Sequence, residues 1–435
     1  MENILILTKR FSIPNANQLE VALKHGAYSS LEKLFSMKPE DVVEEVKKSN
    51  LKGRGGAGFP TGLKWSFIPK DTKKPIYLCV NADESEPGTF TDRYIMEYDP
   101  HLLIEGIINT SYAIKSHTAY IYIRGEYVKQ YQILSRALEE ARKAGYVGKN
   151  ILGSGYDLDI WLHRGAGAYI CGEETGLIES LEGKKGQPRI KPPFPAVEGL
   201  FRSPTIVNNV KTIASVPWIV LNGGEAYAKI GTKDSTGTNI FGVSGHVNQP
   251  GYWELPFGMR FLEFLEKYPK GVKGGKLKAL IPGGSSTPVL TAEECEDLYL
   301  SYESMLAHKT FLGTGGMIVM NEHTDMVKAL KTLTRFYSEE SCGQCTPCRE
   351  GTSWLDRLLD RILNREATTK ELDLLIEISD NMEGKTICAL AAACAMPVRS
   401  FVTKFRSDFE KYVKPISIPV HKVAEKIIQK EPIAS

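Results

Sequence analysis

The first fifty residues carry apolar side chains at helical spacing. Leu19 and Leu23 lie about one turn apart, as do Leu31 and Leu34, and this recurrence is typical of amphipathic helices. The stretch PEDVVEEVKKS predicts a further helix, because Pro39 suits a first helical position and acidic residues follow it. We therefore expect residues 16–50 to be mainly helical.

From residue 74 the chain alternates between strand and helix patterns. The segments KPIYLCVN, TAYIYIRG and YDLDIWLHR, at 74–81, 118–125 and 156–164, are typical of strands. Between them, HLLIEGIINTSYAI and YQILSRALEEARKAG are typical of helices, the second of which ends at Gly145. This alternation continues to about residue 235 and predicts an α/β domain.

The pattern changes twice more toward the C-terminus. Short strands, turns and the helical segment FLEFLEKY predict a small α+β domain at 238–325. From residue 326 the pattern is helical. We expect three domains, at 1–237, 238–325 and 326–435, and a mobile tail after Lys414.

Composition narrows the class of partner. The 435 residues carry a net charge of +2 with 24% charged side chains of mixed sign, which offers no case for nucleic acid. The apolar run NILIL near the N-terminus lacks a full signal-peptide core. No stretch reaches the roughly 18 apolar residues of a membrane span. We expect a soluble, intracellular chain without direct membrane insertion, which can still dock on a membrane complex through another protein.

Four cysteines indicate a metal centre. Cys342, Cys345 and Cys348 form a CxxCxxC motif, and Cys388 stands alone about forty residues on. Three closely spaced thiolates and one remote thiolate are typical of a 4Fe–4S cluster. A structural zinc site usually pairs CxxC with a second CxxC or with two histidines, and no such pair exists here. Zinc and unligated thiols remain the alternatives.

The other cysteines show no pairing pattern. Cys79, Cys171, Cys295 and Cys394 are too sparse for a disulfide scaffold, which indicates a reducing compartment. We interpret Cys394, six residues after Cys388, as a small apolar filler rather than a ligand.

A first glycine-rich loop follows the N-terminal helices. Gly53, Gly55 and Gly58 satisfy GxGxxG, but a helix precedes them where a dinucleotide fingerprint requires a strand. Glycines still let backbone N–H groups approach a phosphate or a flat ring. Arg54 and Lys64 add positive charge at the same place. The alternative is a purely structural turn.

A second glycine-rich loop follows a strand and opens a helix. It contains Gly165, Gly167 and Gly172, and a helix N-terminus offers free N–H groups and a positive dipole end to a phosphate. Glu173 and Glu174 fall in the first turn of that helix. They either partner the helix dipole or bond ribose hydroxyls or a bound water.

An acidic loop follows the first strand of the α/β domain. Asp83, Glu84 and Glu86 stand just after the carboxyl end of that strand, where open α/β sheets bind ligands. Carboxylates suit ribose and ribityl hydroxyls and repel an additional 2′-phosphate. A solvated acidic loop is the alternative.

Further candidates are aromatic or amide side chains in loops. Phe59, Phe67 and Phe194 lie in glycine- or proline-rich segments, and such rings are more often core than stacking platforms. Asn208, Asn209 and Thr212 lie at a predicted helix start, where capping alone explains one of them.

Long ordered motifs between about residues 28 and 400 resemble one family closely. They are GRGGAGFPTGLKW, NADESEPGTFTDR, DPHLLIEG, GAGAYICGEETGLIESLEG, PRIKPPFPA, SPTIVNNVKTI, VNQPGYWELPFG, IPGGSSTPVL and ESCGQCTPCREGT. The protein resembles the NADH-binding, FMN-containing flavoprotein subunit of respiratory NADH:quinone oxidoreductase (complex I), the F-type subunit. One departure is Ala391, where the family usually has glycine after the fourth cluster ligand.

The resemblance implies three cofactors: FMN, NADH and one 4Fe–4S cluster held by Cys342, Cys345, Cys348 and Cys388. Phe59, Phe67 and Phe194 would stack on the adenine end of NADH, Glu84 and Glu86 would contact NADH, and Glu174 would disfavour NADPH. The residues that would line the FMN are Arg54, Gly55, Gly56, Lys64, Asn81, Asp83, Gly172, Glu173, Asn208, Asn209 and Thr212. The implied cofactor-binding set is Gly53, Arg54, Gly55, Gly56, Ala57, Gly58, Phe59, Lys64, Phe67, Asn81, Asp83, Glu84, Ser85, Glu86, Gly165, Tyr169, Gly172, Glu173, Glu174, Phe194, Asn208, Asn209 and Thr212.

The resemblance also implies the architecture and the reaction. It implies an α/β flavin- and NADH-binding domain, a ubiquitin-like β-grasp domain and a helical bundle that carries the cluster. NADH would pass hydride to FMN without a protein acid or base, and electrons would leave singly through the cluster toward quinone. Its partners would be a thioredoxin-like 2Fe–2S subunit and the large iron–sulfur subunit of the peripheral arm, on the cytoplasmic side of the membrane. The alternatives are a diaphorase subunit of an NAD-linked hydrogenase or formate dehydrogenase, and a zinc-stapled scaffold.

Overall fold

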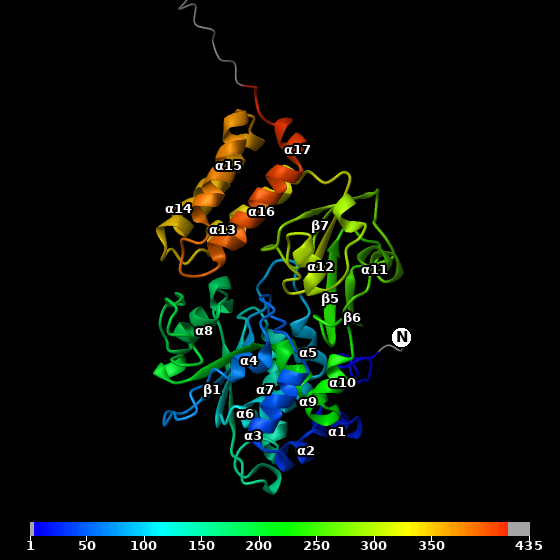
Figure 1. The fold of residues 1–435 in the computed structure, drawn as a ribbon, viewed down its shortest axis with the longest axis vertical. Coiled ribbons are helices and arrows are strands. Elements are labelled where there is room, and N and C mark those ends of the chain that lie inside the picture. Colours follow the sequence, from blue (N-terminus) through cyan, green and yellow to red (C-terminus); the bar gives the residue numbers. More distant parts are fainter. Residues whose placement is uncertain (1–3, 416–435) are drawn as a thin grey trace, which may run out of the picture.

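The computed structural model describes residues 4–415 (Figure 1). Its first helices are α1 (Leu19–Lys24), α2 (Leu31–Ser36), α3 (Pro39–Lys48) and α4 (Thr61–Trp65). Pro39 occupies the first turn of α3, and the apolar side chains Val42 and Val46 of that helix are buried. The prediction of a helical N-terminal region is confirmed.

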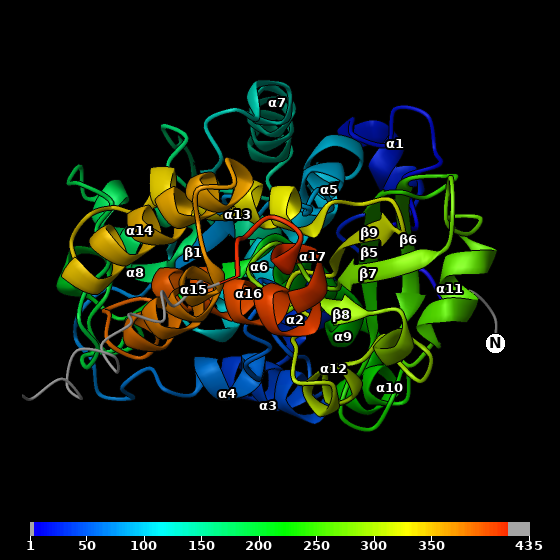
Figure 2. The same ribbon diagram turned by 90° about the horizontal axis from the view of Figure 1, so that it is seen from above.

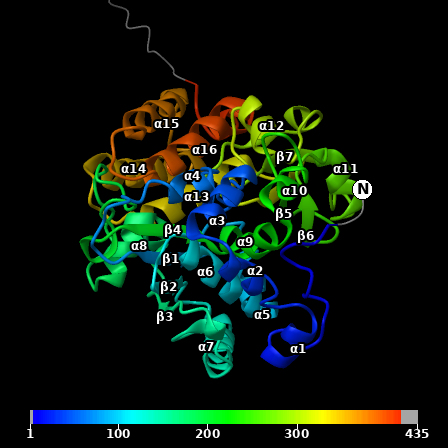
Figure 3. The same ribbon diagram turned by 60° about the horizontal axis from the view of Figure 1, so that its bottom comes forward.

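A parallel sheet forms the centre of the next region. Its strands are β1 (Tyr77–Ala82), β2 (Thr118–Ile123), β3 (Asp159–Arg164) and β4 (Thr205–Asn209), in the order β3-β2-β1-β4. Figure 3 shows this order from below. In the register of the sheet, Asn81 pairs with Asn209, so the carboxyl ends of β1 and β4 lie side by side. This edge is where a parallel sheet presents its ligand site.

Both faces of this sheet are covered, as a parallel sheet requires. Leu78 and Val80 of β1 belong to one core with the helices on the first face. Cys79, between them, belongs to a second core with Leu177 and Ile178 of α8. The helices and 3-10 turns of this region are α5 (Asp92–Tyr98), α6 (Pro100–Ala113), α7 (Val128–Lys143), α8 (Glu174–Leu181), α9 (Val210–Asn222), α10 (Gly224–Ala228), η1 (Ile151–Gly153), η2 (Tyr169–Gly172) and η3 (Leu200–Arg202).

A second, mixed sheet follows with its own core. Its order is β6-β5-β9-β7-β8: β5 and β6 form an antiparallel hairpin, β5 pairs with β9 in parallel, and β7 pairs with β9 and β8 in antiparallel. Phe241, Phe261 and Phe264 lie at the centre of its core. The elements are β5 (Thr238–Gly245), β6 (Gly251–Pro256), α11 (Phe261–Lys267), β7 (Leu277–Ile281), β8 (Leu290–Thr291), η4 (Glu293–Cys295), α12 (Tyr302–Ala307) and β9 (Gly316–Asn321).

Helices alone form the last region. They are α13 (Met326–Glu340), α14 (Thr346–Leu363), α15 (Thr369–Met382), α16 (Leu390–Lys404) and α17 (Arg406–Glu410). This bundle lies at one end of the molecule, above the parallel sheet and beside the second sheet (Figures 1 and 2). Within residues 4–415, no helix has both the length and the apolar character to cross a bilayer. The tail predicted to be mobile lies almost entirely outside the described residues.

The predicted sequence of elements is confirmed as a mixed α/β chain with a parallel sheet and a C-terminal helical region.

Candidate functional site

Two adjoining cavities open at the carboxyl edge of the parallel sheet. We call the larger one, of about 880 Å³, the aromatic cavity, because Phe59, Phe67 and Phe194 line it. We call the other, of about 520 Å³, the acidic cavity, because Asp83 and Glu86 line it. The two cavities share a wall made of Gly55, Ala57, Asn81, Gly172, Glu173 and Asn209.

The first glycine loop forms part of the shared wall. It connects α3 to α4, so the prediction that it is not an ordinary dinucleotide turn is confirmed. A Cβ on Gly55 would stand 3.1 Å from the Cβ of Asn209, and Gly56 has a φ of +126°, a conformation that favours glycine. The N–H groups of Gly55, Gly56 and Ala57 donate no hydrogen bond to any residue between 4 and 415. They are therefore available to an anion.

Arg54 is bonded within the fold through part of its guanidinium, while its Nε is buried without a partner in the described chain. Its side chain is buried, and its guanidinium donates to the carbonyls of Thr236 at 2.7 Å and Thr238 at 3.3 Å. It also lies over the ring of Phe257. Arg54 lines the acidic cavity, but its guanidinium mainly fastens the glycine loop to the start of the second sheet.

The aromatic cavity presents three exposed rings. Phe59, Phe67 and Phe194 are 44%, 49% and 57% exposed, and the first two have ring centroids 6.0 Å apart. They are not core side chains, so the structure favours the stacking interpretation over the alternative.

Two lysines and two glutamates form an ion-pair network in this cavity. Lys64 lies 2.9 Å from Glu174, and Lys191 lies 2.8 Å from Glu173 and 3.1 Å from Glu174. Burial raises the pKa of Glu174, but Lys64 and Lys191 outweigh burial, so its pKa is lowered overall. Glu174 is therefore a carboxylate that faces the cavity. Lys191 was missed by the sequence analysis.

The three acidic side chains of this loop differ in their hydrogen bonds: Asp83 has an oxygen without a partner, whereas Glu84 and Glu86 accept hydrogen bonds within the described chain. Asp83 has one oxygen that is buried without a partner in the described chain, and the other accepts from Ser85 at 2.6 Å. Burial raises the pKa of Asp83 to about 7. A ligand donor would satisfy this oxygen, so Asp83 is the carboxyl of the loop best placed to meet one.

Glu84 lines the acidic cavity, and its carboxylate caps a helix. It accepts from the N–H groups of Thr91, Asp92 and Arg93 at 2.6, 2.7 and 3.1 Å, at the start of α5. The hydroxyl of Tyr127 donates to it at 2.8 Å. Its oxygens thus accept four hydrogen bonds within the fold, and its expected contact with NADH stays a prediction.

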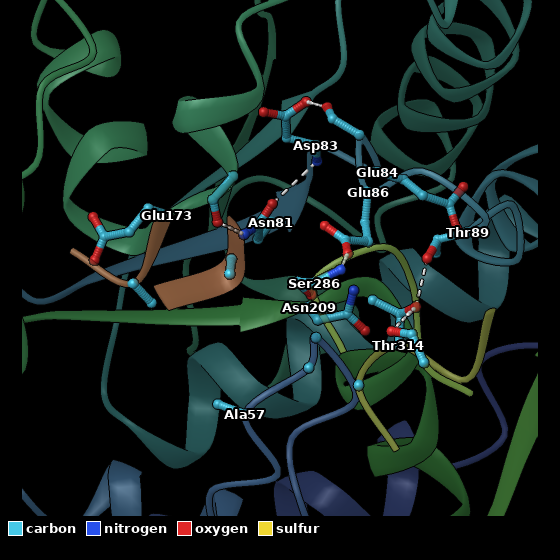
Figure 4. A pocket seen from close by; sticks show the side chains of 18 of the residues that line it. Ala57, Asn81, Asp83, Glu84, Glu86, Thr89, Glu173, Asn209, Ser286 and Thr314 are labelled. Atoms are coloured by element: carbon cyan, nitrogen blue, oxygen red, sulfur yellow. Dashed lines mark hydrogen bonds between the residues drawn. The ribbon is translucent and has the colours of Figure 1, made fainter. Parts of the chain in front are cut away.

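Glu86 joins three parts of the molecule (Figure 4). Its carboxylate accepts from the Tyr169 hydroxyl at 2.6 Å and from the Ser286 N–H at 2.7 Å. The hydroxyl of Ser285 lies 3.2 Å from Glu86 and 2.8 Å from the hydroxyl of Tyr337 in α13. Glu86 therefore connects the acidic loop to the second sheet and to the bundle.

In the second glycine loop, the structure favours the first of the two interpretations of Glu173, a partner of the helix N-terminus. Glu173 caps α8 by accepting from the N–H groups of Thr175 at 2.7 Å and Gly176 at 3.0 Å. The helix end expected to bind phosphate is therefore already occupied by its own carboxylate. Gly165 lies against Tyr122 and lines neither cavity, whereas Gly172 accepts from the Asn81 amide at 2.8 Å in the shared wall.

The polar side chains at the end of β4 and the start of α9 are held by the fold. Asn209 caps α9, as one of the three candidates was expected to do. Asn208 accepts from the Trp65 indole at 2.8 Å, and Thr212 accepts from the Arg54 N–H at 2.8 Å. All three line the aromatic cavity.

Two buried charged residues in the acidic cavity were missed by the sequence analysis. Lys211 lies in the first turn of α9, and Asp92 begins α5. Burial lowers the pKa of Lys211, whereas burial and Glu84 raise the pKa of Asp92 to about 7. No local sequence signal distinguishes a buried lysine in a helix from a solvated one.

The four motif cysteines gather where the bundle meets the cavities. Cys342 and Cys345 lie between α13 and α14, Cys348 lies in the first turn of α14, and Cys388 precedes α16. The N–H of Ile387 donates to the sulfur of Cys345 at 3.4 Å, which brings the fourth cysteine's loop against the motif. Cys388 also lines the acidic cavity.

The cysteine arrangement suits a cluster better than a single ion. Among residues 4–415, no three His, Cys, Asp or Glu side chains converge as closely as one metal ion requires. A 4Fe–4S cluster takes one thiolate on each iron, so its ligands stand wider apart than the four ligands of zinc. Cys394, expected to be a filler, is buried in α16, and burial raises its pKa.

Comparison with known proteins agrees with this site. Residues 46–218 match the family model described as the Nuo51 FMN-binding domain. Residues 328–412 match the NADH-ubiquinone oxidoreductase-F iron–sulfur binding region. The second match covers all four cysteines and decides against zinc.

Whole-chain similarity is also high. The protein is 52% identical over 401 residues to the F subunit of NADH-quinone oxidoreductase from Rickettsia bellii (strain OSU 85-389), covering 92% of this sequence and 96% of the relative. It is 51% identical over 405 residues to the relative of the same name from Rickettsia massiliae (strain Mtu5), covering 93% and 96%.

A solved structure is similar as well. One polypeptide of an NAD⁺-reducing NiFe hydrogenase in the air-oxidised state matches with a TM-score of 0.81 and 35% identity. The match covers 91% of this protein and 66% of the hydrogenase polypeptide. Because the curated relatives share half of their residues with it over nearly their whole length, the protein belongs to the family of NADH-quinone oxidoreductase F subunits.

Proposed function

We propose that this chain is the NADH-oxidising module of complex I, with NADH entering the aromatic cavity and FMN held in the acidic cavity along the shared wall. One observation carries this assignment: the two cavities adjoin, and the cluster ligand Cys388 lines the second of them. The order of NADH, FMN and cluster thus follows the order of the cavities. When bound, FMN supplies the conversion between two-electron and one-electron chemistry.

The aromatic cavity suits a dinucleotide without a 2′-phosphate. Phe59, Phe67 and Phe194 offer exposed faces for the adenine ring. Glu174 is a carboxylate between two lysines, so it can accept from ribose hydroxyls and repel a 2′-phosphate. These contacts orient the nicotinamide toward the shared wall, and orientation is the protein's contribution to hydride transfer.

The acidic cavity suits a flavin. Asp83 offers an unpartnered buried oxygen, and Gly55 and Gly56 offer free N–H groups. Asn81 and Asn209 complete the wall at the carboxyl ends of β1 and β4. No residue of the chain is proposed as an acid or base in the hydride step.

The remaining assignments concern the whole assembly. We assign domains to 1–237, 238–325 and 326–435, supported by the start of β5 at Thr238 and of α13 at Met326. The strand order β6-β5-β9-β7-β8, with its parallel β5–β9 pair, supports a β-grasp domain. As a member of this family, the protein works with other complex I subunits. We propose the thioredoxin-like 2Fe–2S subunit and the large iron–sulfur subunit as its neighbours, on the cytoplasmic side of the membrane.

Anaerobic titration of the purified chain with NADH tests the proposal. Visible absorbance reports flavin reduction, and electron paramagnetic resonance reports cluster reduction. We expect flavin bleaching together with a 4Fe–4S signal. A colourless protein that does not respond to NADH would refute the assignment of both cavities.

The second candidate is the diaphorase subunit of an NAD-linked hydrogenase, which the hydrogenase match favours. Its half-reaction with NADH is the same, so only the partner differs. Hydrogen-dependent NAD⁺ reduction by the natively purified complex would favour this candidate, and NADH-dependent quinone reduction would favour complex I.

A further inference from the structure

The acidic cavity contains a buried lysine whose ammonium group has a donor without a hydrogen-bond partner in the described chain. Lys211 has a side chain only 1% exposed, yet it lines the cavity. Its ammonium donates to the Thr91 hydroxyl at 2.9 Å and to the Thr314 carbonyl at 2.8 Å. An ammonium has three donors, and the nearest carboxylate oxygen, Oδ1 of Asp92, is 3.8 Å away, beyond hydrogen-bond distance.

The carboxylate beside Lys211 is also incompletely satisfied. Oδ1 of Asp92 is buried without a hydrogen-bond partner in the described chain, while Oδ2 accepts from the Asn209 amide at 2.5 Å. A buried charge with spare hydrogen-bonding capacity is costly unless something completes it. The pair therefore points to a ligand group in the cavity.

Lys211 differs from the other cations of the two cavities. Arg54, the second cation that lines the acidic cavity, donates to backbone carbonyls through Nη2, although its Nε has no partner in the described chain. Lys64 and Lys191, which line the aromatic cavity, each contact a glutamate within 2.9 Å. Among the described lining residues, Lys211 is thus the lysine with no carboxylate within hydrogen-bond distance, so its charge is left for a ligand anion.

The position of Lys211 selects which end of a flavin it meets. Asn209, two residues before it, touches the glycine loop at Gly55, whose N–H is free. Thr314, which accepts from Lys211, lies across the acidic cavity from Glu173 and the shared wall at Asn81 (Figure 4). With the redox-active ring beside Asn81, Glu173 and Cys388, the other end of the cofactor points along the shared wall toward Gly55 and Lys211.

We propose that Lys211 is the counter-ion of the FMN phosphate, acting together with the free N–H groups of Gly55 and Gly56. This inference rests on the proposed function, because it requires FMN in the acidic cavity. Asp92, Thr91 and Thr314 position the ammonium, and the phosphate completes its donors. A flavin without a phosphate makes no such contact.

Comparing FMN with riboflavin tests this role. The cluster-containing chain is stripped of flavin, and binding of each flavin is followed by quenching of its fluorescence. In Lys211→Gln we expect affinity for FMN to fall about ten- to hundredfold, the range of a charge-assisted hydrogen bond, with affinity for riboflavin unchanged. Lys211→Arg should restore most of the preference for FMN.

Matched variants separate this role from a structural one. Lys191→Gln removes a cavity cation that is already paired and should leave the preference for FMN over riboflavin intact. If Lys211→Gln does not fold, the neutral pair Lys211→Met with Asp92→Asn replaces it, with the same expectation. Unchanged FMN affinity, or equal weakening of both flavins, would overturn the inference. Failure of the wild-type chain to bind FMN would overturn the proposed function and the inference together.

Discussion

Glu84→Gln separates a structural role of this carboxylate from a role in NADH binding. A glutamine keeps one acceptor oxygen for the N–H groups of Thr91 and Asp92, but turns an NH₂ donor toward Arg93 N and the Tyr127 hydroxyl, which now lie 3.1 and 2.8 Å from a carboxylate oxygen. Each hydrogen bond to a charged group contributes about 1.5–3 kcal/mol. The Tyr127 hydroxyl can accept from this NH₂ and donate to the backbone carbonyl of residue 84, so one bond, from Arg93 N, is lost. The substitution should therefore make opening of the α5 N-terminus easier by about 1.5–3 kcal/mol.

Amide hydrogen exchange measures this opening directly. Exchange at Thr91, Asp92 and Arg93 should accelerate about ten- to hundredfold, while the KM for NADH stays unchanged. Glu126→Gln serves as the control, since Glu126 is half-exposed and pairs with Arg124 at 3.2 Å, so exchange there should change little. Unchanged exchange at α5 with a raised KM for NADH would refute the reasoning and would indicate that Glu84 contacts NADH.

Three further predictions concern the cavities and the cluster. Phe59→Ala should raise the KM for NADH about tenfold, the effect of one lost aromatic stack, without lowering FMN content; an unchanged KM in steady-state kinetics would contradict this. Burial raises the pKa of Asp83 from 3.8 to about 7, so the folded chain binds this proton more tightly than the unfolded chain, and stability falls as pH rises between those values. Asp83→Asn should thus raise the thermal midpoint of the flavin-free chain at pH 8 but not at pH 4, and an equal effect at both would argue against it. Cys388→Ser should abolish or alter the 4Fe–4S paramagnetic signal whereas Cys394→Ser retains it, and the reverse result would exchange the roles of the two cysteines.

The order of elements and the chemistry of the cluster could be predicted because both depend on local patterns. The spacing of apolar residues that distinguishes strands from helices is visible among near neighbours in the sequence, and a CxxCxxC motif is typical of cluster ligation. The GxGxxG loop was correctly separated from a dinucleotide fingerprint because the preceding helix was visible in the sequence.

The directions of charged side chains could not be predicted in the same way. Glu84 and Glu86 share one loop, yet the first caps a helix that begins at Asp92, and the second bonds Ser286, two hundred residues away along the chain. Arg54 is fixed by carbonyls at Thr236 and Thr238. Such partners are set by tertiary packing, on which local composition carries no information.

The protein belongs to a family that oxidises NADH with FMN and an iron–sulfur cluster, and the place of Cys388 in the cavity wall has a consequence for how the protein matures. The segment from Cys388 to Met396 contributes Ala389, Leu390 and Ala393 to the same wall. Without the cluster, that wall is held by packing and by the hydrogen bond from the Ile387 N–H to the Cys345 sulfur. Insertion of the cluster should therefore precede stable uptake of flavin. We expect protein produced under iron starvation to purify with less FMN, and full FMN occupancy in cluster-free protein would show that the two insertions are independent.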